Sequence, residues 1–310
     1  MNGEKQTASA VLLVEPAAFA FNAETARTNR FAARAAQGDV ARRAREELAG
    51  LAERLAAAGV EVHILADTPD PPRPDAVFPN NWLSTHADGS LVTYPMAAPS
   101  RRQERRAEAV EALLRGRGFE IARRVDLSPG EREGRFLEGT GSLVLDRPGR
   151  RAFACLSGRT HPQAVAGFGA ELGYSAHLFA AADRHGRPLY HTNVMMSLGS
   201  RFALVCLECV APEERRGLAD ALEAGGRTLI EVGRDQLAGF ACNLLELRDR
   251  DGRALVALSS RAKASLRPDQ RRRLEDLAGP LVDAPIPTIE AVGGGSVRCM
   301  IAEIHLPRAL

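Results

Sequence analysis

The chain has 310 residues, 45% of them hydrophobic, which suits one large or two ordinary globular domains with a full apolar core. Its 41 basic and 39 acidic residues leave a net charge of +2, so bulk electrostatics recruits neither nucleic acid nor a membrane surface. The sequence contains neither a signal peptide nor an apolar run of about eighteen residues, so we expect a cytoplasmic protein without a membrane partner.

The beginning of the chain predicts a tail, two strands and a helix. Residues 1–8 are polar and predict a flexible tail, followed by a single catalytic domain over residues 9–310. A strand is predicted at residues 8–14 and another at 60–65. Between them, apolar residues spaced three and four apart predict an amphipathic helix over residues 39–58.

The next segment predicts a loop with a function. Residues 71–82 contain four prolines, the adjacent Asn80 and Asn81, and the single tryptophan, Trp82. Proline removes a backbone donor and fixes φ, so this segment can be neither a helix nor a central strand. A loop of this composition is more often functional than decorative.

A repeat of about fifty residues then organises the remainder of the chain. From residue 141 a unit of strand, turn, strand, helix and strand recurs three times, and residues 81–121 fit the same plan. A fifth unit starts at residues 299–306 and is completed by the N-terminal strand and helix. We therefore predict an α/β fold: a five-bladed pseudo-symmetric α/β propeller of ββαβ modules, closed by the two termini. The predicted strands are 91–95, 141–145, 152–156, 175–179, 193–198, 202–207, 228–232, 242–247, 254–258, 281–284 and 299–306, and the predicted helices are 100–116, 212–224, one from 162 and one ending at 277.

In such a ring the first strands of all units surround the central axis. Polar residues open these strands, so side chains from distant parts of the sequence would meet in one concave pocket, the usual form of a small-molecule site. They are Asn81, Glu138, His191 with Asn193, Asn243 and Cys299.

Five cysteines, few and odd in number, argue against a disulfide scaffold. Cys299 follows three glycines, residues 293–295, which permit a close backbone approach, so it is a candidate nucleophile if a cationic group lowers its pKa. For a single cysteine the alternative, a buried core residue, is the more common outcome. Cys206-x-x-Cys209 falls in an apolar segment, and we interpret it as core packing in a strand, not a zinc site.

Six motifs in one order resemble the guanidino-group-modifying superfamily, which contains arginine deiminase, dimethylarginine dimethylaminohydrolase and amidinotransferases, all five-bladed α/β propellers. The resemblance spans nearly the whole chain. The motifs are Glu138-Gly139-Thr140-Gly141, His191-Thr192-Asn193, Cys299 after its glycines, Asp75-Ala76-Val77-Phe78-Pro79-Asn80-Asn81, Ala98-Pro99-Ser100-Arg101-Arg102 and Leu156-Ser157-Gly158-Arg159-Thr160.

The resemblance implies a role for each matching residue. Cys299 would attack the substrate and leave a covalent S-carbamoyl intermediate, with His191 shuttling protons. Glu138 would orient His191 or contact the substrate. The remaining positions would bind substrate: Arg101 and Arg159 the α-carboxylate, Asp75 the α-ammonium, and Asn80, Asn81 and Asn193 the reacting group. No metal or other cofactor is implied, the partner is a small amino acid, and a homo-oligomer is compatible with the sequence.

The departures from the family pattern bear on the substrate. Asn80, Asn81 and Asn193 stand where relatives have acidic residues, and Gly141 replaces the last aspartate of the acidic loop. A buried guanidinium without counter-charge is costly, whereas amides complement a neutral ureido group. The sequence is thus most similar to the citrulline-utilisation branch, and we expect hydrolysis of citrulline to ornithine, carbon dioxide and ammonia.

Two alternatives stay open at this point. The first is a deiminase or dimethylaminohydrolase acting on a guanidino substrate such as arginine or methylarginine. The second is a binder without catalysis, because the same fold occurs in a ribosome-binding anti-association factor. A binder would need neither Cys299, nor His191, nor Glu138.

Overall fold

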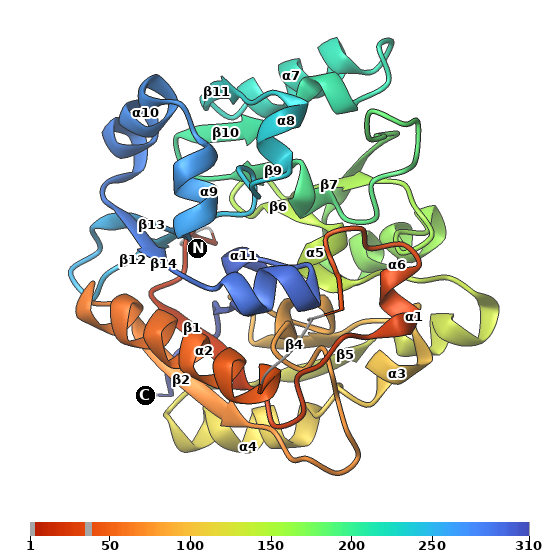
Figure 1. The fold of residues 1–310 in the computed structure, drawn as a ribbon, viewed down its shortest axis with the longest axis vertical. Helices are drawn as coiled ribbons and strands as arrows, with labels where there is room; N and C mark the ends of the chain where they lie inside the picture. Colours follow the sequence, from red (N-terminus) through yellow and green to blue (C-terminus); the bar gives the residue numbers. More distant parts are fainter. Residues whose placement is uncertain (1–3, 35–38, 310) are drawn as a thin grey trace.

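The computed structural model describes residues 4–34 and 39–309 as a mixed α/β fold with five separate three-stranded sheets (Figure 1). In every sheet the middle strand pairs antiparallel with one neighbour and parallel with the other. The sheets, with the middle strand second, are β3 (Leu83–Thr85), β4 (Ser90–Thr93) and β5 (Arg123–Asp126); β6 (Val144–Asp146), β7 (Arg151–Cys155) and β8 (Ser175–Phe179); β9 (Met196–Leu198), β10 (Phe202–Val205) and β11 (Thr228–Glu231); β12 (Leu245–Arg248), β13 (Ala254–Ser259) and β14 (Leu281–Ala284); and β15 (Ala302–Ile304), β1 (Ala10–Glu15) and β2 (Glu61–Ala66).

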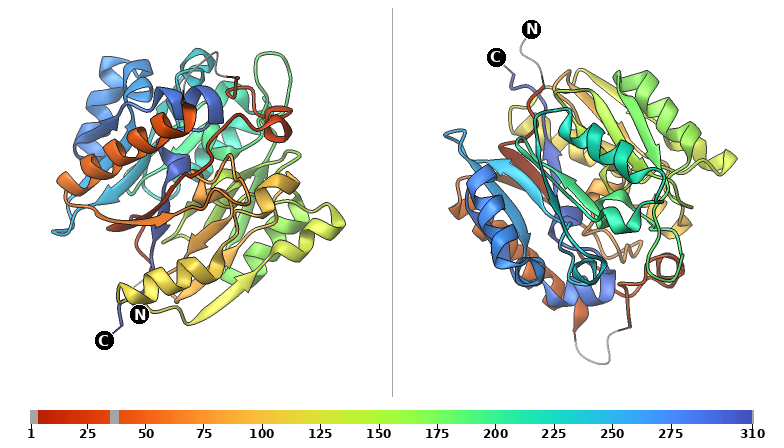
Figure 2. Two further views of the ribbon diagram at one scale, coloured as in Figure 1. Left: turned by 60° about the horizontal axis from the view of Figure 1, so that its bottom comes forward. Right: turned by 90° about the horizontal axis from the view of Figure 1, so that it is seen from above.

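The fifth sheet joins the two ends of the chain, as the repeat predicted. In it β1 pairs antiparallel with β15, with Ala10 opposite Ile304, and parallel with β2, with Ala10 opposite Glu61. Two further views show the sheets arranged around a shared centre with the longer helices outside them (Figure 2).

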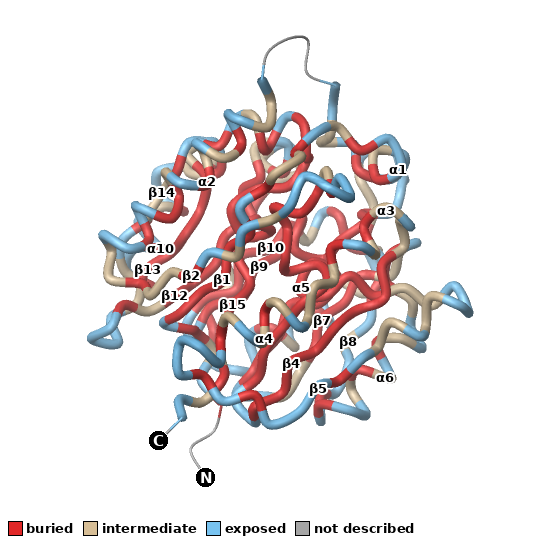
Figure 3. The backbone as a smooth tube through the Cα atoms, turned by 90° about the horizontal axis from the view of Figure 1, so that it is seen from below, coloured by how far each residue is buried: buried red, intermediate tan, exposed pale blue. Residues whose placement is uncertain are grey.

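The longer helices cover the sheets because each carries one apolar face. In α2 (Val40–Ala57), residues Ala44, Leu48, Leu51 and Leu55 are buried at three- and four-residue spacing, as an amphipathic helix requires. Figure 3 shows burial concentrated in the central strands and exposure on the outer helical surfaces. The other long helices are α4 (Ala107–Gly116), α6 (Pro162–Leu172), α7 (Arg215–Glu223) and α10 (Pro268–Ala278).

Several predicted strands begin instead as short helical turns. The predicted strand at 299–306 is α11 (Val297–Met300) followed by β15, and the one at 141–145 is α5 (Gly139–Ser142) followed by β6. An apolar run cannot distinguish a strand from one buried turn. Two other modules also begin with a short helical turn, η1 (Pro79–Asn81) and η3 (Thr192–Val194). The strand predicted from residue 242 is β12, which begins at Leu245.

The helix predicted over residues 100–116 is two helices, α3 (Pro99–Arg102) and α4. The Arg73 Nε atom donates to the carbonyl oxygen of Gln103 at 2.8 Å, which diverts that acceptor from a continuous helix. Ala98 occupies the N-cap position of α3, and Pro99 opens the helix. The helix predicted to end at 277 is also two, α9 (Ser260–Ser265) and α10, separated before Pro268.

The predicted tail is partly structured. Glu4 is buried, its Oε1 lies 2.7 Å from Arg147 Nη1, and its Oε2 accepts from the Tyr174 hydroxyl at 3.0 Å. Residues 4–8 are therefore packed against the body of the protein, whereas residues 1–3 lie outside the described residues. The extent of the catalytic domain, residues 9–310, stays a prediction.

Candidate active site

Six of the nine predicted site residues line one small cavity of about 20 Å³ at the centre of the molecule. The other three, Glu138, Asn80 and Asn193, lie directly behind this wall and hydrogen-bond to residues that form it. All nine are buried. The six lining residues are Asp75, Asn81, Arg101, Arg159, His191 and Cys299.

Cys299 lies on α11, and its Sγ atom accepts hydrogen bonds from two side-chain amide groups. Asn193 Nδ2 lies 3.5 Å from Sγ and Asn243 Nδ2 lies 3.3 Å from it. Asn243 Oδ1 in turn accepts from the Arg298 backbone N–H at 3.1 Å, which fixes the orientation of the amide. Donors aimed at sulfur stabilise a thiolate, the form in which cysteine is a nucleophile.

His191 and Glu138 form a buried pair, with Nε2 2.7 Å from Oε2. Burial lowers the pKa of His191 to about 4, although Glu138 counteracts part of this effect. Burial raises the pKa of Glu138, but Arg159 and the hydrogen bond with His191 outweigh it, so the net pKa lies well below the ordinary range. An ionised Glu138 only accepts hydrogen bonds, so neutral His191 carries its proton on Nε2 and leaves Nδ1 as an acceptor.

A glycine makes room for the imidazole. A Cβ atom on Gly141 would lie 2.8 Å from His191 Nδ1 and 2.5 Å from Asn81 Nδ2. Any other residue there would displace one of these side chains. The replacement of the family's aspartate by Gly141 thus has a steric consequence as well as the loss of a charge.

Arg101 is held by carboxylates. Its Nε and Nη2 atoms donate to the two oxygens of Glu104 at 2.9 and 2.7 Å, its Nη1 donates to Asn81 Oδ1 at 2.7 Å, and its Nε lies 3.8 Å from Asp75 Oδ2. Burial raises the pKa of Asp75, and raises that of Glu104 to about 7. Arg101 therefore reaches the predicted place but is already paired, and the sequence reasoning missed Glu104.

Arg159 is held by a different set of partners. Its Nη1 lies 3.2 Å from Glu138 Oε2, its Nη2 donates to Thr28 Oγ1 at 2.6 Å and to the Thr25 carbonyl at 2.9 Å, and its guanidinium lies 4.9 Å from the ring centre of Tyr190. Arg159 thus joins the predicted catalytic pair to the segment before residue 34.

The sequence reasoning also missed four residues of the cavity wall. Asn29 Nδ2 donates to the carbonyl oxygens of Gly293 and Gly294 at 3.1 and 3.2 Å, and the Tyr190 hydroxyl donates to the latter at 3.1 Å. The length of the connection between residues 15 and 40 was a usable signal, because long loops in compact domains are often functional. The four are Thr25, Asn29, Phe78, which was quoted only as part of a motif, and Tyr190.

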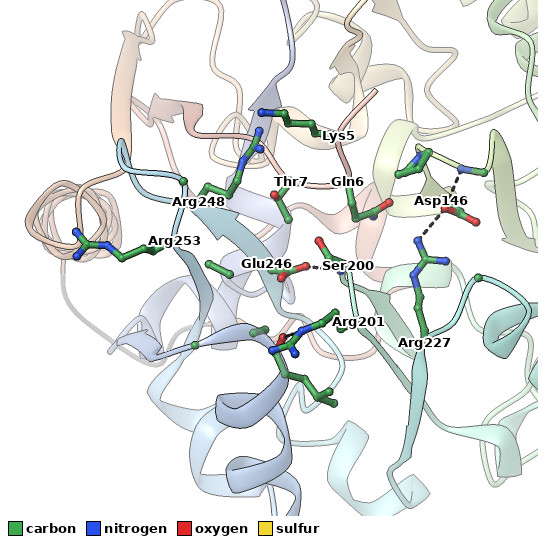
Figure 4. Close-up of a pocket in the computed structure, with 18 of the residues that line it drawn as sticks. Lys5, Gln6, Thr7, Asp146, Ser200, Arg201, Arg227, Glu246, Arg248 and Arg253 are labelled. Atoms are coloured by element: carbon green, nitrogen blue, oxygen red, sulfur yellow. Dashed lines mark hydrogen bonds and ion pairs between the residues drawn. The ribbon is translucent and has the colours of Figure 1, made fainter. Parts of the chain in front are cut away.

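A second cavity, of about 1,040 Å³, is much larger but has different chemistry (Figure 4). Its described lining contains arginines and carboxylates but neither cysteine nor histidine. There Arg227 Nη2 donates to Asp146 Oδ1 at 2.8 Å. Cavity volume alone therefore does not locate the nucleophile, and we assign the candidate site to the smaller cavity.

Within residues 4–34 and 39–309, no group of three His, Cys, Asp or Glu side chains is arranged to hold a metal ion. Among the helices described, none combines the length and the hydropathy that crossing a bilayer requires.

A family model described as N,N dimethylarginine dimethylhydrolase, eukaryotic, matches residues 15–306. No curated protein sequence matches the chain.

Solved structures share the fold at low sequence identity. The first is ArgZ, an arginine dihydrolase from the ornithine–ammonia cycle in cyanobacteria, with 16% identity and a TM-score of 0.75 over 97% of this chain. This chain spans only 41% of the length of that protein. A second structure contains the N-terminal domain of ArgZ alone, with a cysteine-to-serine substitution and bound substrate. It matches with 16% identity and a TM-score of 0.73, over 95% of this chain and 97% of that domain. A dimethylarginine dimethylaminohydrolase in adduct with S-methyl-L-thiocitrulline has 15% identity and a TM-score of 0.65, over 97% of this chain and 100% of that one.

Proposed function

Because the chain belongs to the dimethylarginine dimethylaminohydrolase family of C–N hydrolases, we propose that it hydrolyses the guanidino group of free arginine or a methylated arginine. This is the first of the alternatives that the sequence left open. We prefer a guanidino substrate to citrulline because of the buried charges around the cavity.

The observation that carries the proposal is the balance of buried charge around the cavity. Three carboxylates, Asp75, Glu104 and Glu138, face two guanidinium groups, those of Arg101 and Arg159. His191 is neutral near pH 7, because its pKa is about 4. A cationic amino acid would restore neutrality, whereas zwitterionic citrulline would not. Burial is the main cause of the raised pKa values of Asp75 and Glu104, and at Glu104 the neighbouring carboxylates of Asp75 and Glu138 raise the pKa further.

The asparagines do not oppose a guanidino substrate. Asn81 Oδ1 accepts from Arg101, and Asn81 Nδ2 donates to Asn80 Oδ1 at 3.1 Å. Asn193 Nδ2 donates to Cys299. Asn81 is engaged through both ends of its amide, whereas Asn80 Nδ2 and Asn193 Oδ1 are buried without a hydrogen-bond partner, so the three amides are only partly free to bind a ureido group. ArgZ, which is named an arginine dihydrolase, also has a solved structure of its N-terminal domain in which an asparagine is replaced by serine and a reaction intermediate is covalently bound.

Because His191 and Cys299 line the same cavity, a two-step mechanism is possible there. His191 Nδ1 accepts the thiol proton of Cys299, and the thiolate attacks the guanidino carbon. Protonated His191 then donates to the departing nitrogen, which leaves as ammonia or a methylamine, and an S-alkylthiouronium remains on Cys299. His191 next takes a proton from water, the resulting hydroxide attacks the same carbon, and the thiolate leaves. One water is consumed, and arginine becomes citrulline and ammonia.

Citrulline is the second candidate substrate, favoured by the two asparagine amides beside Cys299. If citrulline stays bound, the same residues can attack its ureido carbon, and a second water then yields ornithine, carbon dioxide and ammonia. We further propose that the five sheets form a pseudo-symmetric ring of five blades around this site.

The test is product identification. The protein is incubated separately with arginine, a methylated arginine and citrulline, and the amino-acid products are separated and identified, with Cys299→Ser as the inactive control. Release of citrulline from arginine or methylarginine supports the guanidino proposal, and further conversion to ornithine adds the second step. Ornithine from citrulline with both guanidino substrates untouched would replace the proposal with the ureido one.

A further inference from the structure

Cys206 and Cys209 form a close pair of thiols outside the candidate active site. The sequence predicts both inside an apolar strand, but β10 ends at Val205 and the chain continues as the 3-10 turn η4 (Leu207–Cys209). This turn brings the two Sγ atoms to 3.2 Å. The prediction that both cysteines lie in a strand is therefore wrong, whereas the prediction that they pack in the core is confirmed. Small side-chain rotations would suffice to join the two sulfurs.

The two cysteines differ in their contact with a cavity. Cys206 is fully buried, whereas Cys209 forms part of the wall of a cavity of about 460 Å³. Arg187, Leu189 and Arg234 also line this cavity. Cys209 therefore borders a space large enough for a small molecule, although it is only 3% exposed, whereas Cys206 is 0% exposed and does not line this cavity.

Arg234 favours the thiolate form of Cys209. Its Nε–H is buried without a hydrogen-bond partner, and its Nη2 donates to the Glu208 carbonyl. The hydrogen bond from the Cys206 thiol and then Arg234 lower the pKa of Cys209, although burial raises it. The hydrogen bond to Cys209 and burial raise the pKa of Cys206. A low-pKa thiol at the wall of a cavity, beside a second thiol buried behind it, is the arrangement of an attacking and a resolving cysteine.

We propose that Cys206 and Cys209 are a redox-active dithiol oxidised by small hydroperoxides, with Cys209 as the attacking sulfur and Cys206 as the resolving sulfur. The Cys209 thiolate attacks one peroxide oxygen, the O–O bond breaks, and the other oxygen takes a proton and leaves as water or an alcohol. The Cys206 sulfur then attacks Cys209, forming the S–S bond, and the hydroxyl leaves as water with the Cys206 proton. The peroxide receives two electrons and two protons from the two thiols, so no further reactant is needed.

The primary test uses the natural chain. Trypsin cleaves after Arg201 and Arg215, so both cysteines lie in the peptide 202–215, and Cys155, Cys242 and Cys299 lie in others. After brief treatment with hydrogen peroxide, alkylation and digestion, peptide 202–215 should be lighter by two hydrogen atoms than its reduced form and carry no alkyl group. Cys155 and Cys242 should stay reduced, because burial raises the pKa of both. A peptide 202–215 that remains doubly alkylated while Cys299 oxidises would overturn the proposal.

Variants assign the two roles. Cys206→Ser should accumulate a sulfenic acid on Cys209 that dimedone traps, and Cys209→Ser should leave Cys206 reduced; the reverse pattern contradicts the assignment. Arg234→Gln should slow disulfide formation roughly tenfold near neutral pH. The control Arg272→Gln, on the exposed face of α10, should not.

Two further experiments identify the class of oxidant and test whether the dithiol reacts independently of the candidate active site. Oxidation by glutathione disulfide but not by hydrogen peroxide would show that hydroperoxides are the wrong oxidant. In Cys299→Ser, peptide 202–215 should form the same disulfide as in the wild type, because the oxidation of the dithiol does not require the proposed hydrolase activity. Disulfide formation that required Cys299 would overturn the dithiol as a separate site.

Discussion

The Nε2 atom of His191 lies 2.7 Å from Oε2 of Glu138, although 53 positions separate the two residues. Since Glu138 remains ionised, it determines which ring nitrogen holds the proton. Replacement by glutamine keeps a similar shape but removes the charge. Glu138→Gln should lower kcat by about 10²- to 10⁴-fold with a much smaller change in KM. Steady-state kinetics on arginine, with circular dichroism to confirm folding, provides the measurement.

The pH profile separates positioning of His191 from a general structural role of Glu138. The acidic limb of kcat/KM should reflect the neutral form of His191, whose pKa is about 4. In Glu138→Gln this limb should move to lower pH, because the anion that raises the pKa of His191 is gone. A limb that stays in place while activity falls would contradict the pairing as a functional one.

His191 should also make the protein less stable in mild acid. Its ordinary pKa is 6.5 and its folded pKa is about 4, so the folded state prefers the neutral ring. The contribution of the neutral His191 ring to the free energy of unfolding is fully present above pH 6.5 and is lost progressively as the pH falls toward 4. Between pH 7 and pH 5 the wild type should lose about 2 kcal/mol more unfolding free energy than His191→Gln does. Urea titrations at both values measure this difference, and equal losses would contradict it.

Cys299→Ser should abolish turnover while the protein remains folded, because a hydroxyl is far less acidic than a thiol and His191, with a pKa of about 4, is too weak a base to activate it. Iodoacetamide should alkylate Cys299 before Cys155 and Cys242. Burial raises the pKa of Cys155 to about 12 and raises that of Cys242 well above its usual value. Mass spectrometry of the digested protein gives the order. Equal rates at the three positions, or an active serine variant, would rule out Cys299 as the nucleophile.

Asp75 provides a test of how the substrate backbone is bound. Asn22 Nδ2 and Thr25 Oγ1 donate to its Oδ2 at 2.9 and 3.2 Å, so Asp75 is held rigidly in the cavity wall. If it binds the α-ammonium group, Asp75→Asn should raise the KM for arginine roughly 10- to 100-fold. The KM for the analogue without the α-amino group should not change. The same change at the exposed Asp251 serves as the control, and an equal effect on both substrates would assign Asp75 to another role.

Gly141 tests the steric requirement of the site. Gly141→Ala would place a methyl group within 3 Å of both Asn81 Nδ2 and His191 Nδ1. We expect a loss of kcat of at least about 10²-fold, as misplaced catalytic groups usually produce. Gly167→Ala, in helix α6 with no atom within 4 Å of the new methyl group, should retain activity and gain about 0.5–1 kcal/mol of stability. Comparable activity of the two variants would show that the contact does not matter.

The sequence by itself determined the repeat, and it predicted nine site residues that the structure places in or directly behind the wall of one cavity. Apolar periodicity places most strands within two residues of their positions, and two of them, β8 and β14, at the predicted bounds. It also identified the N- and C-terminal strands as parts of one module, which the pairing of β1 with β15 confirms. These features are local or repeated, so neighbouring side chains suffice to specify them.

Only the tertiary structure decided how the polar groups are paired. Glu104 neutralises Arg101, and Asn193 and Asn243 donate to Cys299. The short turns at the start of the modules aim these side chains at the centre, yet in the sequence they are indistinguishable from strands. The balance of charge around the cavity, and with it the proposed preference for a cationic substrate, depends on desolvation and on distances between residues far apart in the chain. A sequence lists the charges, but only the folded chain determines which of them face each other.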